Sequence, residues 1–266
     1  MERKLIAIDL DGTTLNNQSL ITPKTERILK EAQNKGHVVS IATGRPFRMS
    51  SHFYQQLQLN SAMVNFNGSL VHKPFQHWDK EREHFINREI AFDLAGNKEK
   101  LGIEFVAAEN RRSFFVSQLD GVDPNFFGSS TITQSNLLSQ LKDNPTSLLI
   151  KTKPETLQEV ADILHTRYLE VDTKTWGGPH NMLEMTPKGV HKATGLAIIA
   201  HDLDIKRENI IAFGDEYNDV EMLDYAGLGV AMLNGSEKAK QVANDVTSLT
   251  NDQDGVADYL QKYLKL

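Results

Sequence analysis

Three short apolar runs, far apart along the chain, each end abruptly in a group of polar residues. The runs cover residues 5–8, 38–42 and 209–213. Short runs that are mostly apolar are typical of strands that are buried on both faces of a parallel sheet. The polar groups that follow them read Asp9-Leu10-Asp11-Gly12-Thr13, Thr43-Gly44-Arg45 and Gly214-Asp215-Glu216-Tyr217-Asn218-Asp219. Because the carboxyl ends of parallel strands share one edge, where such sheets bind ligands, we expect these groups to meet in one crevice.

Predicted helices and strands alternate around these runs. Thr22-Pro23 is typical of an N-cap followed by proline at the first helical position, and Gly36 of a helix end. Further helices are predicted from Pro46 to about Leu59 and over residues 190–203, 217–226, 236–243 and 256–264, and further strands over residues 62–66 and 228–232. This alternation predicts an α/β fold, a doubly wound parallel sheet with helices on both faces.

The middle of the chain has a different pattern. From about His84 to Met185 the predicted strands are shorter and more polar, with examples at residues 113–117 and 147–152, a helical stretch at 155–168 and a turn at 177–179. We interpret this part as an inserted α+β domain, a cap over residues 83–186, in a core formed by residues 1–82 and 187–266. Trp176 and His180 are candidates to reach a substrate from this insertion, although such residues more often serve packing.

Composition excludes several classes of protein. The 266 residues contain no cysteine, which excludes disulfides, thiolate zinc sites and cysteine-nucleophile phosphatases. The net charge is −6 with no long basic run, so nucleic acid is not the expected partner. No apolar stretch approaches the ~18 residues of a membrane span, and the N-terminus is not typical of a signal peptide. We expect a cytoplasmic protein that is a monomer or a weak homo-oligomer.

Asp9, Asp11 and Asp215 are the candidate metal ligands. Carboxylates that lie close together repel unless a cation or a proton intervenes. With no cysteine, and no histidines at metal-ligand spacing, three carboxylates suit a hard cation, and Mg²⁺ is the common choice for phosphate chemistry. The alternative is that each aspartate caps a following turn or helix, which would be preferred for any one of them alone but not for all three at strand ends.

Four motifs in order resemble those of the haloacid dehalogenase-like phosphatases. The group that begins at Asp9 is similar to the first motif, Thr43 stands at the place of the second, Lys192 in Pro187-Lys188-Gly189-Val190-His191-Lys192 is similar to the third, and the group from Gly214 to Asp219 to the fourth. The large insertion between the second and third motifs resembles the α+β cap of the Cof-type subgroup. One such motif alone is weak evidence, but four in order across the chain are specific.

The resemblance implies a Rossmann-like core and a magnesium-dependent phosphatase. Asp9 would be the nucleophile that forms an aspartyl-phosphate, and Asp11 the general acid and then the general base. Mg²⁺ would be held by Asp9, Asp11 and Asp215, with Asp219 in support. The phosphoryl oxygens would be held by the Leu10 and Gly44 N–H groups and the side chains of Thr43, Lys192 and Asn218.

Several alternatives remain open at this stage. Lys188 competes with Lys192 for the third motif, Thr43 is also suited to cap the helix after Pro46, and Arg45 either binds the leaving group or pairs with an acid. A phosphomutase would share the nucleophile, and a phospho-accepting receiver module would share the aspartates but not the cap. Serine hydrolase and P-loop motifs are absent from the sequence. The substrate is expected to be a small phosphorylated metabolite such as a sugar phosphate, and its identity is not encoded in any motif.

Overall fold

The computed structural model of the protein describes residues 2–120, 122, 137–175 and 181–266. The chain forms two compact units. The first comprises Met1–Arg45, Ser50–Arg82 and His191–Leu266, and the second comprises Pro46–Met49 and Glu83–Val190. The predicted turn at 177–179, Trp176 and His180 lie outside the described residues.

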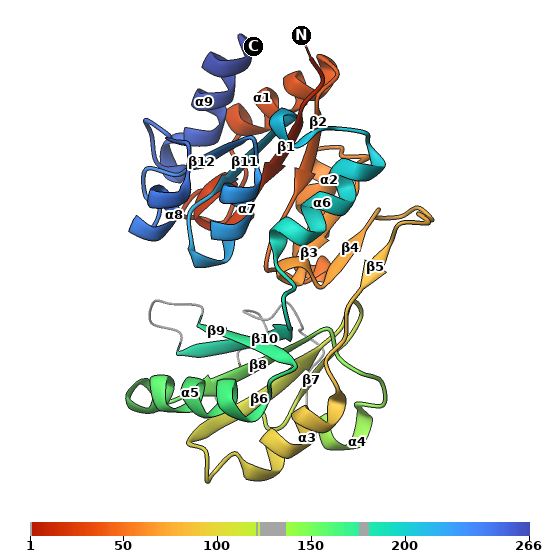
Figure 1. The fold of residues 1–266 in the computed structure, drawn as a ribbon, viewed down its shortest axis with the longest axis vertical. Helices are drawn as coiled ribbons and strands as arrows, with labels where there is room; N and C mark the ends of the chain where they lie inside the picture. Colours follow the sequence, from red (N-terminus) through yellow and green to blue (C-terminus); the bar gives the residue numbers. More distant parts are fainter. Residues whose placement is uncertain (1, 121, 123–136, 176–180) are drawn as a thin grey trace. The chain divides into compact units, whose positions relative to one another are not determined.

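The first unit is built on a five-stranded parallel sheet with the order β13-β12-β11-β1-β2 (Figure 1). The strands are β1 (Leu5–Ile8), β2 (Val38–Ile41), β11 (Ile210–Gly214), β12 (Leu228–Ala231) and β13 (Asp245–Val246). A parallel bridge between Ala42 and Val64 connects the edge of this sheet to a smaller one. The smaller sheet has the order β3-β4-β5, formed by β3 (Met63–Asn65), β4 (Leu70–His72) and β5 (Arg82–Glu83). The predicted doubly wound parallel-sheet fold is confirmed.

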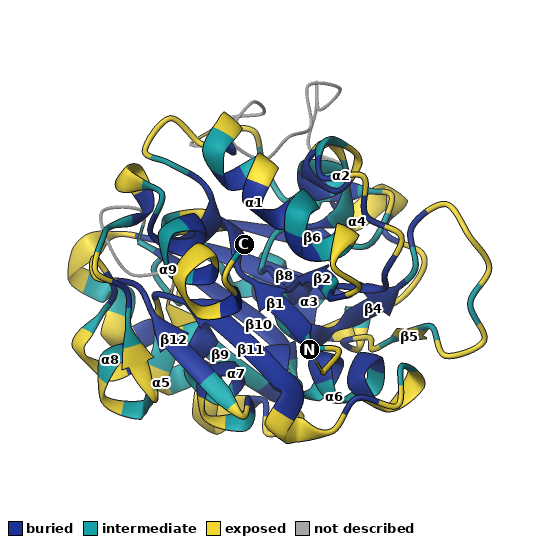
Figure 2. Cartoon of the chain, turned by 90° about the horizontal axis from the view of Figure 1, so that it is seen from above, coloured by how far each residue is buried: buried dark blue, intermediate teal, exposed yellow. Residues whose placement is uncertain are grey.

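Helices cover both faces of the parallel sheet. Successive side chains along each strand point to opposite faces of the sheet. Leu5 and Ala7 pack with α6 and α7 on one face, and Phe213 meets Tyr259 of α9 edge-to-face, with ring centroids 5.6 Å apart, on the other. The helices of this unit are α1 (Pro23–Asn34), α6 (Lys192–Asp202), α7 (Val220–Tyr225), α8 (Glu237–Val242), α9 (Gly255–Leu264) and, from Ser50 on, α2 (Phe47–Gln56). Figure 2 shows these strands buried between helices whose outer residues are exposed. Each fully buried aliphatic side chain contributes about 1.5–3 kcal/mol to the stability of the folded protein. Packing of helices on both faces therefore holds in place the strand ends that carry the polar groups.

Short helical turns mark where the sequence predictions and the structure differ. The predicted helix over 217–226 is a 3₁₀ turn followed by α7, because the Asp219 carboxylate accepts backbone N–H groups just before it. The predicted helix from 190 begins at Lys192, because Gly189 has a φ of +70° in the preceding turn. The short turns are a π-helical turn at Leu10–Thr14 and 3₁₀ turns at Phe66–Gly68, Pro154–Thr156, Arg207–Asn209, Tyr217–Asp219 and Asn251–Gln253.

The second unit is an antiparallel sheet with helices on one face. Its strand order is β7-β6-β8-β10-β9. The elements are α3 (Arg88–Asn97), β6 (Ile103–Glu109), β7 (Phe114–Val116), α4 (Leu137–Gln140), β8 (Ser147–Thr152), α5 (Leu157–Arg167), β9 (Val171–Thr175) and β10 (Met182–Pro187). Leu148 and Ile150 pack with α3 and α5, whereas Leu149, between them on β8, packs with Phe105 and Met182 on the opposite face. This is the α+β character that the sequence predicts for the insertion.

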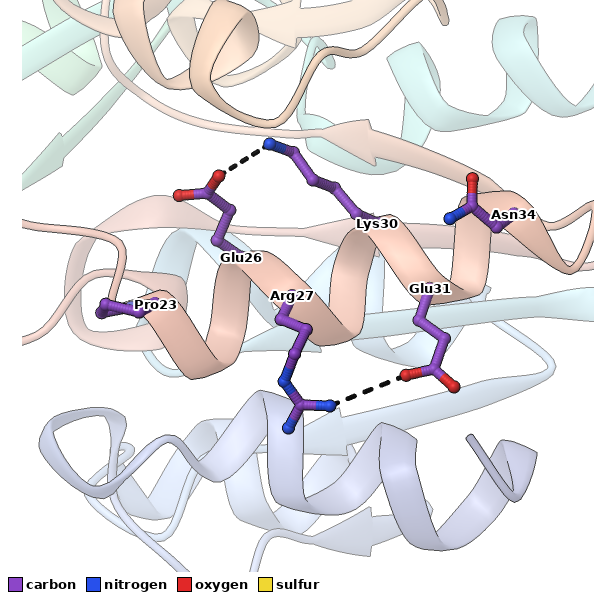
Figure 3. A pocket seen from close by; sticks show the side chains of 6 residues that line it. All are labelled: Pro23, Glu26, Arg27, Lys30, Glu31 and Asn34. Carbon is purple, nitrogen blue, oxygen red and sulfur yellow. Dashed lines mark hydrogen bonds and ion pairs between the residues drawn. The ribbon is translucent and has the colours of Figure 1, made fainter.

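The helices in the described ranges are too short or too polar to cross a membrane. A surface hollow of about 520 Å³ lies along α1 (Figure 3). It is lined by Pro23, Glu26, Arg27, Lys30, Glu31 and Asn34. Two ion pairs, each between residues one helical turn apart, account for its charges: Lys30–Glu26 at 2.7 Å and Arg27–Glu31 at 3.8 Å. None of these residues belongs to the polar groups at the strand ends.

Candidate active site

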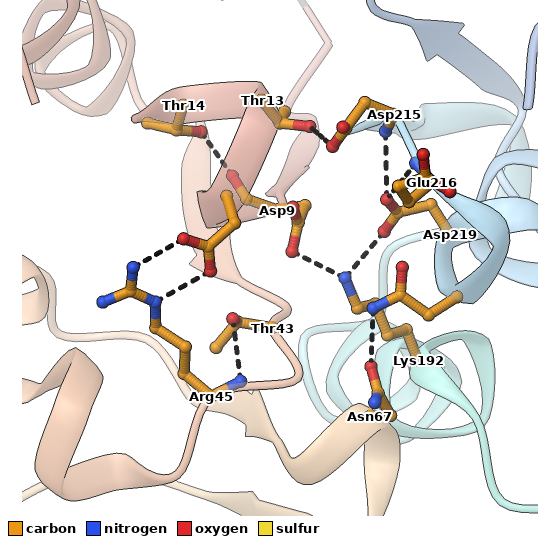
Figure 4. Close-up of polar contacts among 12 residues, drawn as sticks. Asp9, Thr13, Thr14, Thr43, Arg45, Asn67, Lys192, Asp215, Glu216 and Asp219 are labelled. Atoms are coloured by element: carbon orange, nitrogen blue, oxygen red, sulfur yellow. Dashed lines mark hydrogen bonds and ion pairs between the residues drawn. The ribbon is translucent and has the colours of Figure 1, made fainter. Parts of the chain in front are cut away.

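Three aspartates from the strand ends meet in the first unit (Figure 4). Asp9 directly follows β1, and Asp215 directly follows β11, its parallel neighbour. Asp219 lies in the 3₁₀ turn that comes next in the chain. One carboxylate oxygen from each lies within 4.8 Å of the others, and all three side chains are buried. The expectation that distant polar groups meet at one edge of the sheet therefore describes Asp9 and Asp215 correctly.

Lys192 is the cation buried among these aspartates. Its side chain is fully buried at the first residue of α6. Its Nζ donates to Asp9 Oδ1 at 2.6 Å and to Asp219 Oδ1 at 2.7 Å. Burial opposes the charge of this ammonium, but the two carboxylates outweigh burial and raise the pKa of Lys192. Lys192 is therefore charged and fixes the position of both carboxylates.

Lys188, the competitor of Lys192 in the sequence, lies elsewhere. It belongs to the second unit, where its Nζ lies 3.7 Å from Asp172 and its side chain is 55% exposed. Of the two lysines, only Lys192 contacts the aspartates of the strand ends in the described structure.

The acidic cluster carries more negative charge than Lys192 neutralises. Burial raises the pKa of Asp9 well above its ordinary value, with Lys192 opposing and the neighbouring aspartates adding to the shift. Burial, and then the charge of Asp219, raise the pKa of Asp215 to about 7. Three carboxylates beside a single ammonium group repel one another, and an added hard cation relieves this repulsion.

The free oxygens of the cluster fit a divalent cation. Among the described residues, Oδ2 of Asp9 and Oδ2 of Asp215 accept no hydrogen bond, while Oδ1 of each is occupied by Lys192 and Thr13 respectively. Asp219 is different because both of its oxygens are used. Its Oδ1 accepts from Lys192, and its Oδ2 accepts the N–H groups of Asp215 and Glu216 at 3.0 and 3.1 Å. The donor set thus suits Mg²⁺, with Asp9 and Asp215 offering open oxygens.

The carboxylate of Asp11 is not a member of this cluster. Arg45 donates to it through two parallel hydrogen bonds, from Nε to Oδ2 at 2.8 Å and from a terminal nitrogen to Oδ1 at 2.5 Å. The Asp11 side chain is 57% exposed. The observed side-chain cluster is Asp9, Asp215 and Asp219, so Asp11, which the resemblance also brings to the metal through its backbone carbonyl, contributes no side chain to it. Of the two roles weighed for Arg45, pairing with an acid is the one seen in this structure.

The turn that carries Asp11 requires glycine at its centre. Gly12 has a φ of +70°, and a Cβ atom there would lie 2.2 Å from Asp215 Oδ2. The next two residues tie the turn to the aspartates: Thr13 Oγ1 donates to Asp215 Oδ1 at 2.8 Å, and Thr14 Oγ1 donates to the Asp9 carbonyl at 2.6 Å. Thr13 belongs to the first motif, but the motif did not indicate this role.

The remaining predicted residues lie beside the cluster. The Thr43 hydroxyl accepts the Arg45 N–H at 3.1 Å, a contact within its own turn and not the cap of the helix after Pro46 that was the alternative. Asn218 Nδ2 donates to Asn67 Oδ1 at 3.0 Å, and a Cβ atom on Gly44 would lie 3.1 Å from the Asn67 side chain. Leu10 is the first residue of the turn after Asp9, and its side chain is buried. Asn67 lies in the 3₁₀ turn that follows β3, and a polar residue just after a short strand is the signal that could have found it.

Known proteins of one family match this chain over its length. A family model of haloacid dehalogenase-like hydrolases matches residues 6–260. The chain is 38% identical to the 5-amino-6-(5-phospho-D-ribitylamino)uracil phosphatase YitU of Bacillus subtilis (strain 168), with 100% of both chains covered. It is 30% identical to the 5-amino-6-(5-phospho-D-ribitylamino)uracil phosphatase YcsE of the same organism, with 98% of this chain and 96% of the relative covered.

The fold comparison agrees with these relatives. A crystal structure of a haloacid dehalogenase-like hydrolase from Bacteroides thetaiotaomicron superposes with a TM-score of 0.85 at 27% identity, and the match covers 98% of this chain and 100% of that one. The four motifs, the parallel sheet and the position of the aspartates at its edge all belong to the matched region. The chain therefore belongs to the haloacid dehalogenase-like hydrolases.

Proposed function

We propose that this phosphatase hydrolyses a small phosphorylated metabolite with the help of Mg²⁺, through a phosphate ester on Asp9. The observation that carries the proposal is the buried arrangement of Asp9, Lys192 and Asp219, with an open oxygen on Asp9. A nucleophilic carboxylate needs one oxygen held and the other available, and the contact of Lys192 with Oδ1 supports this division of roles. We expect the enzyme to act in the cytoplasm as a monomer or a weak homo-oligomer.

The first half-reaction uses Asp9 and Asp11. Asp9 Oδ2 attacks phosphorus, a bond from this oxygen to phosphorus forms, and the bond from phosphorus to the leaving oxygen breaks. Asp11 gives its proton to the leaving oxygen, so that a neutral alcohol departs. Arg45 holds both oxygens of Asp11 in this structure, so the leaving oxygen must replace at least one of these contacts.

The second half-reaction returns the enzyme to its starting state. Asp11, now a carboxylate, removes a proton from water, and the water oxygen attacks phosphorus. The bond from phosphorus to Asp9 breaks, inorganic phosphate leaves, and Asp11 is again protonated. Atoms and charges balance over the two steps without any oxidant or further reactant.

Asp215 would hold the cation through its open Oδ2, and Asp9 through Oδ1, which keeps a second lone pair beside Lys192, because Asp9 Oδ2 is the attacking oxygen. The Asp11 backbone carbonyl is the third ligand that we propose. When bound, Mg²⁺ supplies positive charge that lowers the repulsion between the Asp9 carboxylate and the phosphate. Asp219 positions Lys192 and the backbone of residues 215 and 216, which is a supporting role.

The groups beside the cluster suit the phosphoryl oxygens. Thr43 retains a hydroxyl proton after accepting from Arg45, and Lys192 retains a third ammonium proton after its two bonds to carboxylates. The Leu10 and Gly44 N–H groups and the Asn218 amide complete the set that we propose. Donors of this kind stabilise the charge of the transferring phosphoryl group.

The first substrate to test is 5-amino-6-(5-phospho-D-ribitylamino)uracil, because two relatives covered over nearly their full length carry it in their names. The test measures phosphate release from this compound and from a panel of sugar phosphates, nucleotides and phosphorylated cofactors, with Mg²⁺ and after chelation with EDTA. The proposal predicts release that disappears with EDTA and returns with Mg²⁺. Full turnover after thorough chelation would reject the metal, and isomerisation of a sugar phosphate without release would favour a phosphomutase.

A further inference from the structure

The loop that carries Asp11 is held from outside by two asparagines. The loop spans Leu10–Thr14 and closes on itself through a hydrogen bond from the Leu15 N–H to the Leu10 carbonyl at 2.8 Å. At its centre, Asp11 and Gly12 leave the helical conformation, with φ and ψ of −72° and 128° and of 70° and −3°. Two consecutive non-helical residues interrupt the internal hydrogen bonds of such a turn, so its carbonyls need other partners.

Asn234 supplies the partner of the Gly12 carbonyl. It lies in the turn after β12, and its Nδ2 donates to Gly12 O at 2.8 Å. Asn234 is exposed and belongs to none of the four motifs. Its hydrogen bond joins residues 222 positions apart in the chain, directly next to the residue that we assign as the general acid.

Asn251 fixes the orientation of the Asn234 amide. The Asn251 backbone N–H donates to Asn234 Oδ1 at 2.9 Å, so the NH₂ group must face Gly12. The Asn251 side chain donates to the Leu15 carbonyl at 2.8 Å in a buried contact. The two asparagines therefore bind carbonyls at the centre and just beyond the end of the same loop.

The turn of Asn234 is also tied to the loop of Asp215. The Met232 N–H donates to the Gly214 carbonyl at 3.0 Å, and the Ser236 N–H donates to the Asp215 carbonyl at 2.8 Å. Asn234 lies between these two anchors in the sequence. It therefore connects the backbone that carries Asp11 to the backbone that carries Asp215.

From these contacts we propose that Asn234 is a positioning residue, which holds Asp11 at the distance that proton transfer to the leaving group requires. Asn234 contacts the loop backbone and not the Asp11 carboxylate, so it acts through Gly12. A general acid works only within hydrogen-bond reach of its target, and a displacement of about 1 Å can cost ~10²-fold in rate. The inference rests on the proposed function, since it assumes that Asp11 is the acid.

The experiment compares Asn234→Ala and Asn234→Asp with the matched control Asn244→Ala. Asn244 also supports a turn beside β12, by accepting the Gly229 N–H at 2.7 Å, but contacts no residue of the Asp11 loop in the described structure. Asn234→Asp keeps the side-chain shape and the oxygen that accepts the Asn251 N–H. It replaces the NH₂ donor to the Gly12 carbonyl by a second oxygen, which repels that carbonyl. The kinetic constants kcat and KM are measured with an alkyl phosphate substrate and with p-nitrophenyl phosphate, whose leaving group needs little protonation.

We expect both Asn234 variants to lower kcat for the alkyl phosphate by about tenfold or more, with KM changed less than threefold. For p-nitrophenyl phosphate we expect a loss below threefold, and Asn244→Ala should change neither substrate. Since the Asn234 side chain is exposed, the melting temperature should stay close to that of the parent protein. Wild-type kcat on the alkyl phosphate in Asn234→Asp, or equal losses on both substrates, would overturn the inference.

Asp11→Asn separates failure of this inference from failure of the proposed function. If Asp11→Asn shows the same preferential loss on the alkyl phosphate and the Asn234 variants do not, Asp11 is the acid and Asn234 does not position it. If Asp11→Asn itself shows no preference between the leaving groups, the assigned role of Asp11 is wrong, and with it the role inferred for Asn234.

Discussion

At the residue scale, Lys192 is the side chain on which the buried acidic site depends. It makes 2.6 and 2.7 Å contacts to two carboxylates and has no exposure to solvent. In the sequence, only its spacing within the motif favoured this lysine over Lys188. In the structure the two differ clearly: Lys192 is the first residue of α6, whereas Lys188 pairs with Asp172 at the surface of the second unit.

Lys192→Met should destabilise the protein strongly. Removing one partner of a buried ion pair leaves uncompensated charge, at a cost of about 3–5 kcal/mol. The free energy of unfolding is measured by urea titration in EDTA. The matched control Lys188→Met breaks only an exposed pair and should cost less than about 1 kcal/mol. Equal effects of the two substitutions would contradict the role that we give to Lys192.

His37 should make the first unit sensitive to acid. Its Nδ1 accepts the Lys4 N–H at 3.2 Å, and its buried Nε2 has no partner among the described residues. Burial, and then the charges of Lys4 and Lys35, lower the pKa of His37. The unfolded chain therefore binds a proton as the pH falls through about 6.5 while the folded chain does not, so stability is lost on acidification below that pH.

The variant that checks this effect is His37→Asn, whose side-chain oxygen can still accept the Lys4 N–H. Melting temperatures are compared at pH 7.5 and pH 5.5, with His77→Asn as the exposed control. The loss on acidification should be smaller in His37→Asn than in the parent protein and unchanged in the control. An identical loss in all three proteins would show that His37 does not contribute.

The sequence predicted the residues of the site better than their contacts. Asp9, Asp215 and Lys192 could be chosen because each stands at a strand end or a helix start with a motif around it. That the Asp11 carboxylate pairs with Arg45, and that Asn234 and Asn67 contact the site loops, depends on backbone positions that are far apart in the sequence. The spacing within a motif carries no information about such long-range contacts.

At the element scale, the sequence predicted those elements whose ends carry a local signal. Residues 5–8 and 147–152 form strands with the expected bounds, and α1 starts after Thr22 as its cap predicts. The longest strand in the described ranges, β6, was not singled out, because Ala107-Ala108-Glu109 at its end favours a helix locally. Its pairing with β7 and β8 on both sides overrides that preference.

Thr22→Ala should weaken α1 at its first turn. The Thr22 hydroxyl accepts the Thr25 N–H at 3.2 Å and donates to the Asp254 carboxylate at the start of α9. Loss of an N-cap of this kind costs about 0.5–2 kcal/mol. Urea unfolding measures the change, and Arg27→Ala, which removes an exposed pair on the same helix, should cost no more than about 0.5 kcal/mol. A cost for Thr22→Ala no larger than that of the control would argue against the cap.

At the scale of the whole molecule, the change of sequence pattern near residue 83 indicated that the chain forms two different kinds of domain. Alternating strands and helices predicted the parallel sheet, and the shorter polar strands predicted a second kind of sheet in the insertion. The order of strands within each sheet was not predicted, since it depends on which strands pair across long loops. Nor did the sequence predict that Pro46–Met49 would group with the second unit.

We predict that the second unit selects the substrate. Lys151 and Lys174 share the face of its sheet opposite to α3 and α5, as the register through Glu184 and Leu149 shows. Lys151→Ala and Lys174→Ala should change the ranking of kcat/KM over a panel of phosphorylated metabolites, while hydrolysis of p-nitrophenyl phosphate persists. Glu159→Ala, on the outer side of α5, is the control. A uniform loss over all substrates would mean that this face does not select among them.

If Asp9 carries the phosphoryl group during turnover, that group can be trapped on it. The enzyme is mixed with ³²P-labelled substrate and Mg²⁺, quenched with acid within the first turnover, and the labelled peptide is identified by mass spectrometry. We expect label on the peptide that contains Asp9, and neither label nor turnover in Asp9→Asn, which should remain folded. Label on another residue, or wild-type turnover by Asp9→Asn, would contradict this role of Asp9.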